Sequence, residues 1–135
     1  MDVSSYVKQH RDALDLAQRL QRKIQEPQPA VSDIVAILIE LAGKLKFHLS
    51  MEDQYVYPKA IASQDEALRS VAHRMQSEML GISAAFAKYV STWTSVAIGA
   101  DLARFRTETG SLLAALRDRI DREEHSFYPL VHKGL

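Results

Sequence analysis

Apolar residues recur every three to four positions in four segments of the chain, which is the period of an amphipathic α-helix. The segments predict helices over residues 5–25, 33–57, 64–93 and 102–130, separated by short breaks. Ser32, Ser63 and Asp101 stand near the starts of three of these helices and are candidate N-caps. No segment alternates with the period of two that is typical of strands.

Four long helices joined by short loops favour an all-α fold, namely an antiparallel up-down four-helix bundle. The length of 135 residues is that of one ordinary domain, so we expect residues 1–135 to form a single domain.

Each predicted helix face carries polar side chains among its apolar residues. On a helical wheel of about 100° per residue, His10, His48, Glu52 and Glu123 all point inward. His48 and Glu52 are one turn apart and share a face. An isolated buried carboxylate is costly, so it is usually paired, metal-bound or protonated. We therefore expect these four residues to form a shared polar site.

The remaining histidines do not join this site on the wheel. His73 and His125 lie far from the apolar stripes of their helices and are expected to face solvent. His132 lies near the end of the chain, in a tail or a frayed helix end.

The inward groups allow two chemical interpretations. Two imidazoles and two carboxylates suit iron, manganese or zinc, and bundles build such sites from facing helices. There is no cysteine, so a metal would be held by His, Asp or Glu alone. A lone inward His is more often a hydrogen-bonded core residue, however, and a lone inward Glu is usually an ion-pair partner. The residues alone therefore leave open a metal site or a metal-free polar network.

A weak internal repeat relates the ends of the second and fourth predicted helices. Residues 48–58 read HLSMEDQYVYP and residues 119–129 read RIDREEHSFYP. Both segments have Glu at the fifth position, Tyr at the tenth and Pro at the eleventh. The first position is His48 in one segment and Arg119 in the other. We expect the proline to end the helix in both.

These residues resemble the hemerythrin-like (HHE cation-binding) family over essentially the whole chain, most specifically in the segment 48–58. That family has a His in the first helix, His-x-x-x-Glu in the second, His-x-x-x-His in the third, and a His with a carboxylate in the fourth. Its members hold two carboxylate-bridged irons and bind oxygen, or sense or handle oxygen, nitric oxide or iron.

The resemblance implies roles for individual residues. It makes His10 and His48 metal ligands and Glu52 a bridging carboxylate. Either Glu123 or Glu124 would be the fourth-helix carboxylate, and the wheel favours Glu123.

The chain departs from the family pattern at three positions. Met75 and Met79 stand where the family has its third-helix histidines, and Arg119 stands where it has the fourth-helix His. These three imidazoles would serve one of the two irons, so we expect a single metal ion. Arg119 could bridge carboxylates and supply the charge of the missing iron, or its side chain could extend outward to solvent.

Three functions are compatible with this sequence. The favoured one is a metal-binding domain for sensing or storage, holding one ion, with iron as the expected metal, and a small ligand such as oxygen. The second is a metal-free bundle acting as a regulatory interaction module. Its partner surface would include Trp93 with residues 96–98, or Phe127 and Tyr128, unless these pack over the bundle ends.

The third function is an oxidase or peroxidase with Tyr55, beside Glu52, as a redox-active group, although a Tyr there is more often part of the core. We expect no enzymatic activity, because the sequence has no nucleophile–base pattern and no phosphate loop.

Charge and hydropathy limit the classes of partner that we expect for this chain. Lys plus Arg equals Asp plus Glu at 17 each, so the net charge of zero argues against nucleic acid and membrane surfaces. No targeting segment and no apolar run of roughly 18 residues is seen. These features predict a cytoplasmic protein, and helical bundles also offer faces for a homodimer or another protein partner.

Overall fold

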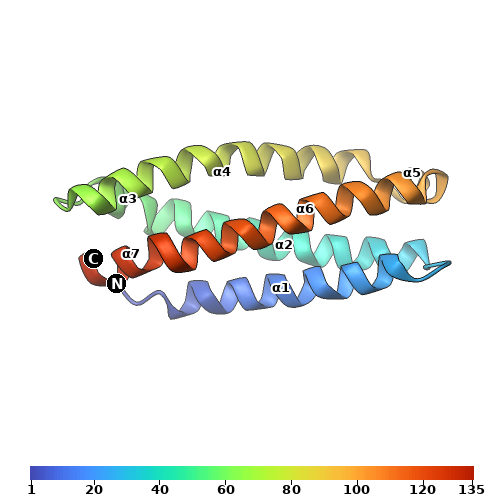
Figure 1. Cartoon of the computed structure of the whole chain (residues 1–135), viewed down its shortest axis with the longest axis horizontal. Coiled ribbons are helices and arrows are strands. Elements are labelled where there is room, and N and C mark those ends of the chain that lie inside the picture. The colour runs from blue at the N-terminus through green and yellow to red at the C-terminus, as the bar shows by residue number, and fades with distance from the viewer.

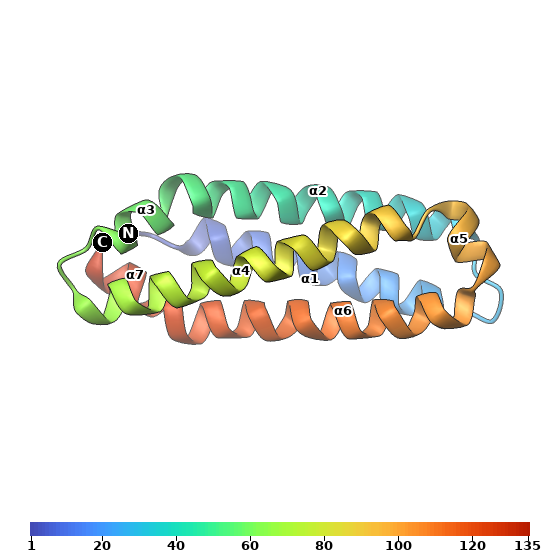
Figure 2. The same ribbon diagram turned by 90° about the horizontal axis from the view of Figure 1, so that it is seen from above.

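Four long helices form the body of the protein in a computed structural model that describes residues 1–135. They are α1 (Ser4–Gln25), α2 (Val31–Tyr55), α4 (Glu66–Thr92) and α6 (Leu102–Arg122). Shorter elements are α3 (Tyr57–Ile61), α5 (Ser95–Ala100), the π-helical segment η1 (Glu123–Phe127) and α7 (Tyr128–Gly134). Figures 1 and 2 show the long helices side by side, with the chain reversing between consecutive ones. The predicted all-α class is confirmed.

Of the three predicted N-caps, only Asp101 is observed as one. Asp101 caps α6 as expected, because its side chain accepts a hydrogen bond from the backbone N–H of Arg104. Ser32 does not cap α2, which begins one residue before it. Ser63 is also not a cap, because Asp65 lies at the start of α4 and accepts two backbone N–H groups there.

The two prolines of the repeat begin short helices, and the prediction that they end long ones was wrong. Pro58 lies in the first turn of α3 and Pro129 in the first turn of α7. A first-turn residue needs no intrahelical N–H bond, so proline fits that position. The long helices end earlier, at Tyr55 and Arg122.

Buried apolar residues form two clusters, one toward each end of the bundle. One contains buried apolar residues of α1 and α2 together with Trp93, Ile98, Phe105 and Leu113. The other gathers α3 and α7 with the start of α4. On α1, His10 lies between Tyr6 of the second cluster and Ala13 of the first. The inward polar residues therefore form a layer between two apolar cores.

Some side chains lie on a different face than predicted. Val90, expected inward, is 43% exposed, while its neighbour Tyr89 is buried and its hydroxyl lies 2.7 Å from Thr109 Oγ1. The reason is that α4 leaves a cavity between itself and α2, and Val90 lines that cavity.

The residues considered for a partner surface mostly pack over the ends of the bundle. Trp93, Ile98, Phe127 and Tyr128 are buried, whereas Val96 is exposed. The packing alternative is therefore the correct one for these four residues.

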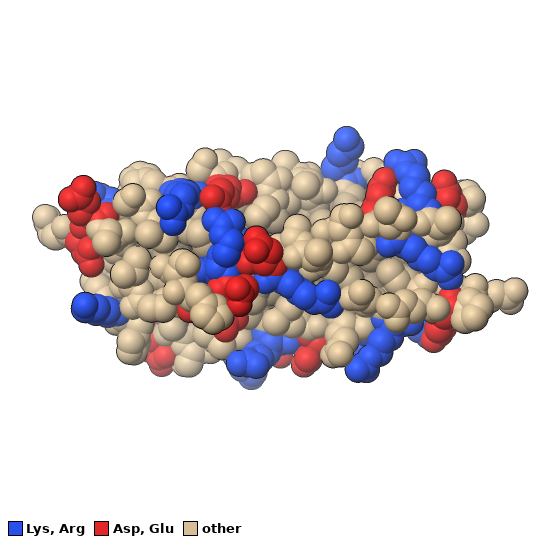
Figure 3. Space-filling model, in the orientation of Figure 1, with Lys and Arg blue, Asp and Glu red and all other residues tan.

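The surface carries both charge signs close together. Figure 3 shows lysine and arginine interleaved with aspartate and glutamate on the face drawn, as a net charge of zero leads one to expect. None of the helices combines the length and the apolarity needed to cross a membrane.

Candidate metal centre

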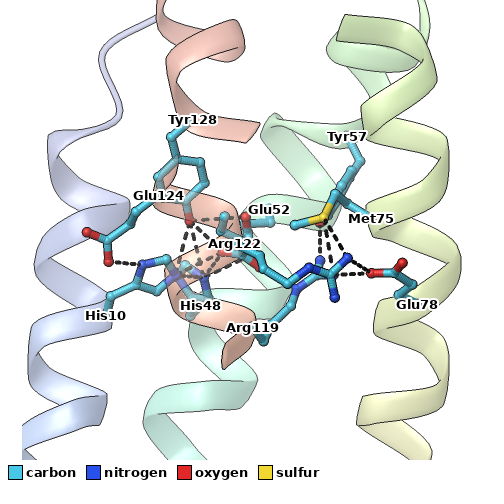
Figure 4. A network of polar contacts seen from close by, with 11 residues as sticks. His10, His48, Glu52, Tyr57, Met75, Glu78, Arg119, Arg122, Glu124 and Tyr128 are labelled. Atoms are coloured by element: carbon cyan, nitrogen blue, oxygen red, sulfur yellow. Dashed lines mark hydrogen bonds and ion pairs between the residues drawn. The ribbon is translucent and has the colours of Figure 1, made fainter. Parts of the chain in front are cut away.

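The four predicted site residues come together between the two apolar clusters. His10 comes from α1, His48 and Glu52 from α2, and Glu123 from the first position of η1. All four are buried, with exposed fractions of 5% or less. The prediction that they point inward is confirmed, and Figure 4 shows how the surrounding residues face one another.

The ligand atoms of these residues converge on one point. His10 Nε2 lies 3.0 Å from His48 Nε2 and 2.9 Å from Glu123 Oε2. One donor atom from each of these three residues lies within 4.8 Å of the other two. His48 Nε2 is also 2.9 Å from Glu52 Oε1. Two imidazole nitrogens and the carboxylate of Glu123 thus share one small volume, and Glu52 adjoins it through His48.

The far side of each imidazole is held by a second partner. His10 Nδ1 lies 2.9 Å from Glu124 Oε2, and His48 Nδ1 lies 2.7 Å from Gln9 Oε1. Both partners are acceptors, so each Nδ1 carries the donated proton and each Nε2 is turned toward the centre. Metal-binding histidines are commonly oriented in this way.

Tyr128 reaches the same centre and was not predicted as a site residue. Its hydroxyl lies 2.9 Å from Glu123 Oε2, 3.2 Å from Glu52 Oε2 and 3.2 Å from His10 Nε2. The π-helical segment makes this arrangement, because the N–H of Tyr128 bonds the carbonyl of Glu123, five residues earlier. Single π turns inside helices often occur at functional sites.

The donor set fits a metal ion. Glu52 Oε1 is buried and makes no hydrogen bond, although it lies close to His48, so its lone pairs are available. Two donors that each lie about 2.1 Å from an ion, at a right angle, are about 3.0 Å apart. The spacing between His10 Nε2 and His48 Nε2 matches that value.

Arg119 lies inward and occupies the other side of Glu123. Its Nε donates to Glu123 Oε1 at 2.9 Å, and its Nη2 donates to Tyr57 Oη at 2.8 Å. Nη1 lies 3.6 Å from the sulfur of Met75. Arg122 and Glu78 form an ion pair beside it. The alternative in which Arg119 extends to solvent is excluded, since the residue is 3% exposed.

Burial and mutual contacts displace the pKa values of the centre. Burial alone would lower the pKa of His48, but the nearby carboxylates of Glu123 and Glu52 outweigh this effect and raise the pKa to about 9. Burial also opposes ionisation of Glu123, yet hydrogen bonds from His10 and His48 hold its pKa well below the usual range. Burial and the charge of Glu123 raise the pKa of Glu52.

These shifts predict how stability depends on pH in the metal-free protein. The pKa of His48 is higher in the folded protein than its ordinary value of 6.5, so its contribution is fully present below pH 6.5 and lost as pH rises toward 9. We expect the free energy of unfolding, measured with urea, to fall by up to about 3 kcal/mol over this window. A His48→Gln variant should lack most of this fall. An unchanged free energy in the unmodified protein would contradict the charged pair.

Tyr55 and Met79 were predicted to line the site, and His73 and His125 were predicted to face solvent. Tyr55 does not line the site and is 43% exposed, because it lies at the edge of the α2 stripe and the chain turns immediately after it. Met79 lines the cavity next to the centre. His73 and His125 are exposed, as predicted.

Comparison with known proteins shows which family the chain matches. The model of the hemerythrin HHE cation-binding domain matches residues 1–131. No curated protein and no solved structure shows a significant match. The match covers α1 to α6, η1 and most of α7, and so includes the residues of the polar layer. The chain therefore belongs to the hemerythrin HHE cation-binding domain family.

Proposed function

We propose that residues 1–135 form one antiparallel up-down four-helix domain that binds a single metal ion, iron in the first place, for sensing or storage in the cytoplasm. The ligands in this proposal are His10, His48, Glu52 and Glu123. The observation that supports it most strongly is that the two carboxylate oxygens of Glu123 contact different partners. One of its oxygens meets His10, and the other meets Arg119.

Arg119 takes the place of a second metal in this proposal. The guanidinium is permanently charged and donates a hydrogen bond to the carboxylate oxygen that would otherwise reach a second ion. Met75, with only a thioether sulfur, lies on the same side. No imidazole is available there, so a dinuclear centre lacks ligands on that side.

The other residues hold the ligands in position. Glu124 and Gln9 fix the two imidazole rings, and Tyr128 donates its hydroxyl proton to one of the carboxylates. Bound iron would supply a Lewis-acidic and redox-active centre with positions for a small ligand such as oxygen. The raised pKa of His48 means that a proton on its Nε2 must leave when a metal binds, so affinity should increase with pH.

A titration of metal-free protein with iron(II) under anaerobic conditions tests the proposal. We expect His48→Ala to weaken iron binding by at least about 100-fold, since it removes a ligand and the partner of Glu52. His73→Ala, which changes an exposed histidine on α4, is the matched control and should bind as tightly as the unmodified protein. Equal binding by both variants would place the metal elsewhere.

The metal-free interaction module remains the second candidate, because His10, His48, Glu52 and Glu123 contact one another without a metal. In that case a protonated His48 would balance the carboxylates. The same titration separates the two functions, since a metal-free module would show no saturable iron binding in the unmodified protein.

A further inference from the structure

The hydroxyl of Tyr128 makes its polar contacts with the four proposed metal ligands and with no other residue. Oη lies 2.9 Å from Glu123 Oε2, 3.2 Å from Glu52 Oε2, 3.2 Å from His10 Nε2 and 3.5 Å from His48 Nε2. Figure 4 shows the ring of Tyr128 pointing its hydroxyl into the group of ligands. The residue is 2% exposed, so its oxygen lies at the centre of the site and away from solvent.

Four of these atoms form a cage with the proportions of a tetrahedral metal site. The atoms are Tyr128 Oη, His10 Nε2, His48 Nε2 and Glu123 Oε2, and their mutual distances lie between 2.9 and 3.5 Å. Donors that lie about 2.0 Å from an ion, at the corners of a tetrahedron, are about 3.3 Å apart. The Tyr128 oxygen therefore occupies the fourth corner around the point on which the two imidazoles and Glu123 converge. Glu52 adjoins the cage at two corners, through His48 and Tyr128.

The internal repeat provides a comparison for this tyrosine. Tyr57 holds the equivalent position in the first segment of the repeat, and its hydroxyl oxygen accepts a hydrogen bond from Arg119 Nη2 at 2.8 Å. The oxygen of Tyr57 thus meets a cation that the chain itself supplies. The oxygen of Tyr128 meets two imidazoles and two carboxylates, where the proposed function places a metal cation.

The charge of the centre indicates which oxidation state Tyr128 favours. The carboxylates of Glu52 and Glu123 balance the two charges of iron(II) while Tyr128 stays a neutral phenol. Iron(III) brings a third charge, and a buried charge is costly unless it is balanced. A phenolate at Tyr128 supplies that balance. The other charged side chains around the centre cancel in pairs, Arg119 and Arg122 against Glu78 and Glu124.

We propose that Tyr128 is a further ligand of this centre and binds iron(III) as a phenolate, with His10, His48 and Glu123 at the other corners of the cage. On binding, the O–H bond of Tyr128 breaks, the proton passes to water, and the electron pair left on Oη forms the bond to the ion. No electron is transferred, because the iron enters as iron(III). The inference rests on the proposed metal site and assigns it a preference for the ferric ion. Tyrosinate is a known protein ligand of ferric iron.

The test is an absorption titration of the metal-free protein with iron(III) citrate. A phenolate bound to iron(III) gives a visible charge-transfer band, which imidazole and carboxylate ligands do not give. We expect the unmodified protein to show this band, with phenolate vibrations in its resonance Raman spectrum. Tyr128→Phe should lack the band and bind iron(III) at least about tenfold more weakly, since it has lost a ligand. Its affinity for iron(II), which leaves the phenol neutral, should change much less.

Tyr57→Phe is the matched control, because Tyr57 is also buried, at 1% exposed, but its hydroxyl meets Arg119 and lies outside the cage. It should keep the band. A band that persists in Tyr128→Phe would overturn the proposal, and so would iron(III) bound by the unmodified protein without the band. That second result would leave the proposed metal site intact. Failure of the unmodified protein to bind either iron(II) or iron(III) would overturn the metal site as well.

Discussion

Replacing Glu123 with alanine is expected to destabilise the metal-free protein by about 3–5 kcal/mol, since it leaves a buried cation without its partner. Glu123 is 1% exposed, and its two oxygens bind Arg119 on one side and His10 with Tyr128 on the other. Urea unfolding at pH 6 measures the change. The same variant should fail to retain iron, because it also loses a proposed ligand.

Two variants serve as controls for that result. Glu124→Ala removes the neighbouring carboxylate, which is 26% exposed and contacts only the outer nitrogen of His10, so we expect a loss of about 1 kcal/mol. Adding Arg119→Met to Glu123→Ala should recover part of the stability, since the unpaired charge is then removed. Equal losses in the two glutamate variants would contradict the central position of Glu123.

Installing histidine at positions 75, 79 and 119 together is expected to raise bound metal from about one to about two ions per chain. Met75 and Arg119 already face each other across 3.6 Å beside Glu123 Oε1, so imidazoles there would adjoin a free carboxylate oxygen. Metal analysis of the purified triple variant measures the change. It tests whether Arg119 and the two methionines are what limits the centre to one ion.

The matched control is Arg119→Met, which removes the cation without adding a ligand. It should bind no second ion. A second ion in that variant would mean that charge alone, rather than the supply of imidazoles, sets the stoichiometry. A single ion in a folded triple variant would show that the helices cannot accommodate a second metal.

Helical periodicity was sufficient to place the inward polar residues. His10, His48 and Glu52 lie within regular α-helices, where a step of about 100° per residue holds over several turns. The same regularity fixed the four long helices to within about two residues at most of their ends, the usual uncertainty of helix boundaries. The fourth helix is the exception, because the predicted segment 102–130 divides into α6, η1 and α7.

The tyrosines of the centre depend on backbone geometry that the wheel does not contain. The π turn inserts one extra residue into a helical turn, so the side chains of Glu123 and Tyr128, five residues apart, face the same point. A bend after Tyr55 likewise turns Tyr57 inward, and Tyr57 meets Arg119. The internal repeat carried a signal for both tyrosines, since it aligns Tyr57 with Tyr128.

Contacts between particular side chains on different helices could not be predicted from the sequence. Gln9 precedes His10 in the chain but bonds His48 on the neighbouring helix, and only the packing of α1 on α2 makes that pair. The cavity beside α4 is similar, because it depends on how far α4 lies from α2 rather than on the apolar stripe of either helix.

The most direct test of the central claim is the metal content per chain of protein purified from iron-supplemented cells, with His48→Ala measured beside it. A single site at His10, His48, Glu52 and Glu123 predicts about one ion per chain in the unmodified protein and almost none in the folded variant. Two ions per chain, or none in either protein, would contradict it.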